Sequence, residues 1–183
     1  MGIIDDLTFD KIIEGNVKNS MKGEQSLEFH IIQSFCEIPK GKEIFRFALV
    51  QFGNYERYDI RNWYDKACKP GKGISLTKEE LSELYLSLKD RDLTHYNDEL
   101  RATYKSDKVS ASIYELICHL SDYSVKDVQW NKELSIIDWG HGPKYDFRRW
   151  TNDYFKCSKG ITVSFECMKI LYNEIKKICD SNS

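Results

Sequence analysis

The sequence lacks the features that mark membrane and secreted proteins. None of its apolar runs approaches the roughly 18 residues that a membrane-spanning helix needs. The N-terminal stretch, MGIIDDLTFD, contains neither the basic segment nor the apolar core of a secretory signal. We therefore expect an intracellular protein without a membrane partner, in the nucleus if its source is eukaryotic and in the cytoplasm or nucleoid if it is bacterial.

Signatures of metal sites and of catalysis are also missing. The 6 cysteines include no C-x-x-C pair, a spacing common to zinc and redox sites. The 4 histidines lie far apart, at positions 30, 95, 119 and 141. In an intracellular protein, cysteines without such spacing are usually reduced thiols. We therefore expect no metal site, no cofactor and no catalytic residue.

The chain has little net charge, but its charges are unevenly distributed. Its 41% hydrophobic and 31% charged residues are typical of a globular protein, and the net charge of −2 does not suggest a nucleic-acid partner. However, residues 42–76 carry seven basic and four acidic side chains, and residues 132–164 carry six and four. Local clusters of basic residues are better indicators of phosphate binding than the total charge. Both segments are therefore candidate binding regions.

These two segments contain the same motif. A constant offset of 87 residues aligns residues 52–77 with residues 139–164 without a gap, and nine of the 26 aligned pairs are identical. A gapless repeat of this length indicates a duplicated structural unit. We refer to the module around residues 52–77 as the first copy and to the module around residues 139–164 as the second copy.

Each copy has the pattern of four strands followed by a helix. Aromatic and β-branched residues alternate along short segments that end at turn residues, as in strands, and Gly53-Asn54 is suited to a hairpin turn. Thr77 with Glu80, and Ser164 in the second copy, are suited to the start of a helix with apolar residues at helical spacing. The expected strands are residues 27–38, 43–52, 57–63 and 73–76 in the first copy and residues 112–120, 134–139, 144–150 and 160–163 in the second.

These patterns predict an α+β protein of two tandem β-β-β-β-α modules with curved antiparallel sheets. Each module is close to the lower size limit for an independent hydrophobic core. We therefore expect the two C-terminal helices to pack together, so that a monomeric chain forms an intramolecular pseudo-dimer. The expected divisions are an N-terminal extension (1–25), the first module (26–91), a polar linker (92–111) and the second module (112–183).

The third strand of each copy carries charged and aromatic residues on one face, where a core strand would carry apolar ones. Such a face suits single-stranded nucleic acid, because bases stack on the rings and cations neutralise phosphates. Stacking contributes about 1–3 kcal/mol per base and tolerates any sequence. With the aromatic that ends the second strand and the lysines of the following loop, the candidate contacts are Phe52, Arg57, Arg61, Trp63, Lys69 and Lys72 in the first copy, and Trp139, Lys144, Arg148, Trp150, Lys156 and Lys159 in the second.

A structural interpretation of the same residues stays open. Trp63 and Trp150 can be core aromatics, and each arginine can pair with the aspartate two residues before it. Gly73 and Gly160 suit either interpretation, because a glycine at this junction allows a positive φ or the close approach of two backbones. Exposure of the two indoles distinguishes the interpretations, since stacking on bases requires partly exposed rings.

The segments YDIRNWYDKACKPGKGISLTKEEL and YDFRRWTNDYFKCSKGITVSFECM resemble the DNA-binding domain of the transcriptional coactivator positive cofactor four, and especially its bacterial YdbC-type relatives. The resemblance covers about residues 27–89 and 112–179. It implies a β-β-β-β-α module that dimerises through its helices and binds single-stranded DNA without strong sequence preference. It also implies a role in transcription or DNA maintenance, with RNA and the transcription machinery as further candidate partners.

The two copies depart from that family's pattern in different ways. The basic hairpin of the family is replaced by Gly-Asn-Tyr-Glu in the first copy and by Gly-His-Gly-Pro in the second. The second copy also has Cys157-Ser158 where the first has Pro70-Gly71, so we expect better ordered phosphate contacts on the first copy. The rival hypothesis is a protein-interaction module that kept the fold and lost its affinity for DNA.

Overall fold

The structure is a computed structural model that describes residues 29–64, 69–94, 104–106 and 109–181. The predicted N-terminal extension lies outside these residues, and the predicted linker is described only in part. The chain forms two compact units, Met1–Lys78 and Glu79–Ser183. Within the described residues, no helix is long and apolar enough to cross a membrane. The same residues contain no group of three or more His, Cys, Asp or Glu side chains placed to hold a metal ion.

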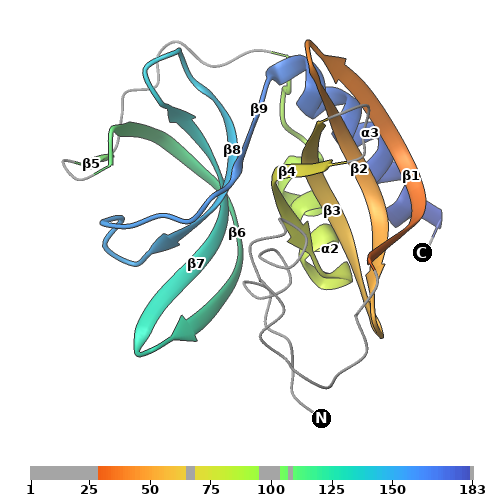
Figure 1. The fold of residues 1–183 in the computed structure, drawn as a ribbon. Helices are drawn as coiled ribbons and strands as arrows, with labels where there is room; N and C mark the ends of the chain where they lie inside the picture. The colour runs from red at the N-terminus through yellow and green to blue at the C-terminus, as the bar shows by residue number, and fades with distance from the viewer. Residues whose placement is uncertain (1–28, 65–68, 95–103, 107–108, 182–183) are drawn as a thin grey trace. The chain divides into compact units, whose positions relative to one another are not determined.

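The first unit contains a four-stranded antiparallel sheet whose strands follow one another in chain order (Figure 1). All four strands predicted for the first copy are confirmed, and the last begins four residues earlier than the pattern suggests. Gly53 and Asn54 form the expected hairpin turn, with Gly53 at a φ of 57°. The strands are β1 (Phe29–Lys40), β2 (Glu43–Phe52), β3 (Tyr55–Tyr64) and β4 (Lys69–Leu76).

Aromatic and aliphatic side chains form a core on one face of this sheet. Phe47, Ile60 and Ile74 lie opposite one another on β2, β3 and β4 and are at most 1% exposed. The rings of Phe35 and Tyr58 pack against Phe47, with centroids 5.0 and 6.2 Å away. This core follows from the period-2 alternation of the strands, which points Phe45, Phe47 and Leu49 to the same side.

The second unit contains a five-stranded antiparallel sheet and two helices. The four predicted strands of the second copy are present, and the first two are considerably longer than predicted, forming the long β6–β7 hairpin of Figure 1. The short strand β5 lies in the segment that the sequence predicts to be a polar linker. The elements are α2 (Lys78–Leu88), β5 (Tyr104–Ser106), β6 (Ala111–Val125), β7 (Val128–Asp138), β8 (Lys144–Thr151), β9 (Ile161–Val163) and α3 (Phe165–Ser181).

Both helices begin where the capping residues predict. The Ser164 hydroxyl accepts the backbone N–H of Cys167 at 3.3 Å, and α2 begins directly after Thr77. The predicted apolar stripes are buried at Leu81, Leu84 and Leu88 on α2 and at Met168, Leu171 and Ile175 on α3. The two helices meet at Tyr85 and Tyr172, whose rings stack with centroids 6.0 Å apart and an interplanar angle of 17°.

The pairing register is the same in the two sheets at equivalent positions. Phe47 pairs with Ile60 between β2 and β3, and Leu134 pairs with Phe147 between β7 and β8, each 87 residues further along. Because a slip of one residue would move every side chain to the opposite face, equal registers give equivalent residues equivalent environments. The two sheets can therefore be compared residue by residue.

Gly73 and Gly160 are required by close backbone approach. A Cβ atom on Gly73 would lie 2.2 Å from Cβ of Arg61 and 2.6 Å from the carbonyl oxygen of Ile60. A Cβ atom on Gly160 would lie 2.3 Å from the carbonyl oxygen of Phe147, the equivalent neighbour. The second of the two explanations offered by the sequence is therefore correct: these glycines let the last strand approach the third.

We predict that Gly73→Ala lowers the free energy of unfolding by about 1–3 kcal/mol, because the added methyl group forces β4 away from β3. Urea denaturation of the full chain measures the loss. Lys72→Ala, a substitution of the exposed neighbour on the same strand, should leave the midpoint almost unchanged. Equal midpoints for the two variants would contradict the close-approach explanation.

Candidate nucleic-acid interface

A buried arginine–aspartate pair occupies the centre of the motif in the first copy. Arg61 donates from Nε to Asp59 Oδ2 at 2.7 Å and from Nη2 to Asp59 Oδ1 at 2.8 Å. Ser75 on β4 donates to the same carboxylate at 3.0 Å. The side chains of Arg61 and Asp59 are 0% and 1% exposed. This two-bond geometry is the strong form of the arginine–carboxylate interaction.

The second copy reproduces this arrangement. Arg148 donates from Nε to Asp146 Oδ1 at 2.8 Å and from Nη2 to Asp146 Oδ2 at 3.0 Å. Thr162, which is equivalent to Ser75, donates to Asp146 Oδ2 at 2.8 Å. Burial lowers the pKa of Arg148, but the hydrogen bonds and charge of Asp146 outweigh it and raise that pKa above its ordinary value. Arg148 therefore stays charged and bound to Asp146.

The third guanidinium nitrogen of each arginine holds the lysine-bearing segment. Nη1 of Arg61 donates to the carbonyl oxygen of Gly71 at 2.9 Å, and Nη1 of Arg148 donates to that of Ser158 at 2.9 Å. Each of these carbonyls lies between the two lysines of its copy: Lys69 and Lys72 in the first, Lys156 and Lys159 in the second. All four lysines are exposed. The arginines therefore position the lysines, and Arg61 has no exposed surface left for a phosphate.

The tryptophans predicted to stack on bases are buried. Trp63 is 4% exposed and Trp150 is 0% exposed, so the expectation that both indoles are partly exposed is wrong. Trp150 packs in a cluster with Ala111, Ile113 and Ile137. The sequence misleads because the charged residues of β3 and β8 suggest an exposed face, whereas ion pairing removes these polar groups from solvent.

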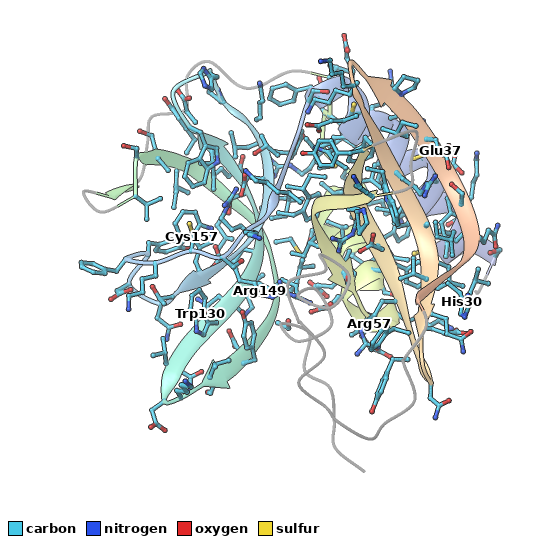
Figure 2. All side chains as sticks on the ribbon, viewed as in Figure 1. His30, Glu37, Arg57, Trp130, Arg149 and Cys157 are labelled. Carbon is cyan, nitrogen blue, oxygen red and sulfur yellow. The ribbon has the colours of Figure 1, made fainter. Side chains whose placement is uncertain are left out.

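The same face is closed around Phe52 in the first copy. Phe52 is 3% exposed, and Ala48 and Val50 on the same face of β2 are 1% and 0% exposed. Arg57, opposite Val50 on β3, is half-buried, and its Nη1 donates to the carbonyl oxygen of Glu56 at 2.9 Å. Figure 2 labels Arg57 near one end of this sheet. In the first copy, the two lysines are therefore the most accessible of the candidate contacts.

In the second copy, Trp139 keeps part of its ring exposed, unlike the other three aromatic candidates. Its indole N–H donates to Asp146 Oδ2 at 3.0 Å, and the guanidinium carbon of Arg148 lies 4.4 Å from its ring centroid. The ring stacks on Trp150 with centroids 6.1 Å apart. Lys144, also half-buried, follows on the adjacent strand. Trp139 and Arg148 thus form a rigid aromatic–cation pair.

Sequence reasoning missed several charged residues of the two sheets. In the first copy, Arg46 lies over the Trp63 ring with its guanidinium carbon 4.7 Å from the centroid, and it bonds Glu37 at 2.8 Å. In the second copy, the equivalent of Arg46 is Glu133, a buried carboxylate that accepts the Tyr154 hydroxyl at 3.1 Å. Burial raises the pKa of Glu133, against the hydrogen bonds that it accepts. At this equivalent position, the first copy therefore carries a cation and the second copy a carboxylic acid.

A second aromatic–cation group lies on the other face of the second sheet. Tyr123 stacks on Trp130 with centroids 6.5 Å apart, and the guanidinium carbon of Arg149 lies 5.8 Å from the Tyr123 ring. Figure 2 labels Trp130 and Arg149 among the side chains of this sheet. Arg149 is only 1% exposed, so it serves packing rather than phosphate binding. The sequence alone does not show that the adjacent residues Arg148 and Arg149 lie on opposite faces of the sheet and have different roles.

The first copy is similar to a known protein family. A family model described as Transcriptional Coactivator p15 (PC4) matches residues 39–85. The match covers β2, β3, β4 and most of α2, all of which belong to the first copy. No curated protein matches the chain. The first copy therefore resembles a coactivator domain along most of its length.

We predict that Asp59→Ala lowers the free energy of unfolding by about 3–5 kcal/mol, because it leaves a buried guanidinium without its carboxylate. Asp146→Ala should cost less, since the Arg148 side chain is 14% exposed whereas that of Arg61 is fully buried. Urea denaturation of the full chain measures both. The control is Lys177→Ala, which breaks an ion pair on α3 whose lysine is exposed and should have little effect. A loss from Asp59→Ala no larger than the control's would refute the buried-pair argument.

Proposed function

We propose that this chain is a non-catalytic protein that binds single-stranded nucleic acid, with DNA as the first candidate, in transcription or DNA maintenance. The proposal is supported by the similarity of residues 39–85 to a transcriptional coactivator family. Residues outside that match carry the same buried arginine–aspartate geometry, with equivalent donors and acceptors 87 positions apart. We infer that the chain contains two tandem copies of one such module.

The observation that carries the proposal is the lysine segment held by each arginine. A segment fixed at its centre by a hydrogen bond from a buried guanidinium presents two exposed ammonium groups at set positions. Pre-ordered cations neutralise phosphates without the loss of backbone freedom that a mobile loop would suffer on binding. Both copies have this device, which would be of little use to a purely structural sheet.

We propose that the two copies contribute differently. In the first copy, Lys69 and Lys72 lie on a continuous strand, β4, whereas the equivalent strand of the second copy begins only at Ile161. This difference favours the expectation that phosphate contacts are better ordered on the first copy. The aromatic contact belongs to the second copy, because Trp139 is partly exposed and Phe52 is buried. Bases stack on guanidinium planes as well as on rings, so Arg148 extends this surface.

We further propose that the two modules pair as an intramolecular pseudo-dimer through α2 and α3. In a two-fold interface, a residue close to the axis contacts its own equivalent. Tyr85 and Tyr172 are 87 residues apart, hence equivalent, and their rings stack. The Tyr85 hydroxyl also donates to Asp180 at 3.1 Å, a bond that joins α2 to the last turn of α3.

Cleavage of the linker tests this pairing. We predict that a protein cut by a specific protease at a site inserted between residues 94 and 104 still elutes as one species of full mass, because the α2–α3 contacts hold the fragments together. Size-exclusion chromatography with light scattering measures the mass. Separation into two folded fragments would disprove the pseudo-dimer while leaving the nucleic-acid proposal intact.

Salt-titrated binding to oligo-dT tests the function. We predict that Lys69→Ala with Lys72→Ala lowers the affinity more than Lys156→Ala with Lys159→Ala, and that each pair reduces the salt slope by about 1.4, or 0.7 per phosphate contact. Trp139→Ala should lose about 1–3 kcal/mol of binding. Lys169→Ala with Lys176→Ala on α3 is the charge-matched control.

Parallel titrations with duplex DNA and single-stranded RNA establish the preference for strand and sugar. Binding without a salt slope, or no binding at all, would reject the proposal in favour of the protein-interaction module. Equal effects of the α3 control and the loop variants would show that general charge, rather than the arginine-held lysines, attracts the nucleic acid.

A further inference from the structure

The helix α2 follows the first sheet in the sequence but is bonded to the second. Glu80, in its first turn, lies against β7 with its two carboxylate oxygens 2.8 and 2.9 Å from Nζ of Lys132. The Ser121 hydroxyl on β6 donates to the same carboxylate. Glu80 is 5% exposed and Lys132 is 0% exposed. A buried ion pair therefore joins a helix of the first copy to the sheet of the second.

Other contacts attach α2 to the same unit. Arg91, just beyond its C-terminus, donates to Glu115 on β6 at 2.7 Å. The Tyr172 hydroxyl on α3 donates to the carbonyl oxygen of Lys89 at 3.4 Å. These contacts explain why the compact units divide the chain at the start of α2, whereas the sequence pattern assigns this helix to the first module.

A buried ion pair is a costly means of stabilising such a contact. The desolvation of both charges can exceed their mutual attraction, and well-packed apolar residues of similar volume are often as stabilising or more so. Removing one partner, by contrast, leaves a buried charge uncompensated and is strongly destabilising. What such a pair does provide is discrimination between a matching and a non-matching partner.

The equivalent positions of the other copy carry no charge. The residue 87 positions after Glu80 is Cys167 on α3, and the residue 87 positions before Lys132 is Phe45 on β2. Phe45 is 2% exposed, so this sheet position is buried in both copies. The pairing of α2 with the second sheet thus has a charged residue at both positions. A reciprocal pairing of α3 with the first sheet would have an uncharged residue at both.

We propose that the Glu80–Lys132 pair selects the partner of each module. The sheet of a second copy then packs against the helix of a first copy and not against the helix of another second copy. The proposal rests on the pseudo-dimer proposed above. A pair of first copies would bury Glu80 against Phe45, and a pair of second copies would bury Lys132 against Cys167. Either pairing leaves a buried charge without a counter-ion, whereas the mixed pairing leaves none.

Interchanging the residues tests the matching rule in the full chain. The variants are Glu80→Cys, Lys132→Phe and the double substitution, which copies the uncharged combination into this site. Each single variant should lower the urea midpoint, and the double variant should recover more than half of the larger loss. The control cycle uses Glu174→Ala and Lys177→Ala, an ion pair on α3 with an exposed lysine. Additive losses at positions 80 and 132 would overturn the proposal.

Charge reversal tests the choice of partner directly. Two full-length chains, Glu80→Lys with one affinity tag and Lys132→Glu with another, are co-expressed and purified through both tags in succession. In a two-chain complex that exchanges modules, the introduced lysine of one chain meets the introduced glutamate of the other. The unaltered Glu80 and Lys132 also meet, so we expect a folded complex of twice the chain mass. Differently tagged copies of the Glu80→Lys chain alone should give none. Equal yields from the two co-expressions would reject the proposal.

Neither experiment includes nucleic acid, so its outcome is independent of the oligo-dT titration. A chain that binds no oligonucleotide can still show the matching rule, and a chain without the rule can still bind. Failure of the linker-cleavage test would remove the pseudo-dimer on which this inference rests, and the co-expression would then yield no complex from either combination.

Discussion

The bond from each buried arginine to its aspartate is the interaction on which the rest of each module depends. It places a guanidinium at the centre of the sheet, where two nitrogens bind the carboxylate and the third binds the lysine-bearing segment that follows. The residue at position 73, or 160 in the second copy, must then be a glycine, because a Cβ atom there would clash with the backbone of the third strand. The positions of the exposed lysines follow from these two constraints. The arginine–aspartate pair, the close approach of the two strands at the glycine and the positions of the exposed lysines therefore depend on one another.

Around this shared frame the two copies differ in what they bury. The first closes its face over Phe52 and keeps Arg46 over Trp63. The second has Glu133 at the position equivalent to Arg46 and leaves Trp139 partly exposed. Since the central bonds are the same in both, these differences are changes of surroundings and not of architecture. This pattern is expected if the two copies contribute differently to binding, as proposed above.

The sequence predicts the elements well because strand alternation, helical spacing and capping residues are local signals. All eight strands and both helices of the repeat are present, although β4, β6 and β7 extend beyond the predicted bounds, and Ser164 caps its helix as expected. Prediction fails where the outcome depends on distant partners. Trp150 is buried by residues from β6 and β7, and Glu80, which the pattern assigns to a capping box, binds Lys132 52 residues away. A lysine at an inward position of a strand is the one sequence signal that could have revealed this pair.

Under the proposed function, the burial of the arginines limits how strongly the chain binds nucleic acid. With Arg61 enclosed and Arg148 bound to Asp146, the contacts left for phosphates are mainly the four exposed lysines. Four phosphate contacts on a single strand correspond to a salt slope of about 3. Such binding depends steeply on ionic strength but lacks the additional phosphate contacts of a basic protein, in agreement with the net charge of −2. Under the function proposed here, stacking on Trp139 supplies much of the affinity that remains at high salt, where the lysines contribute least.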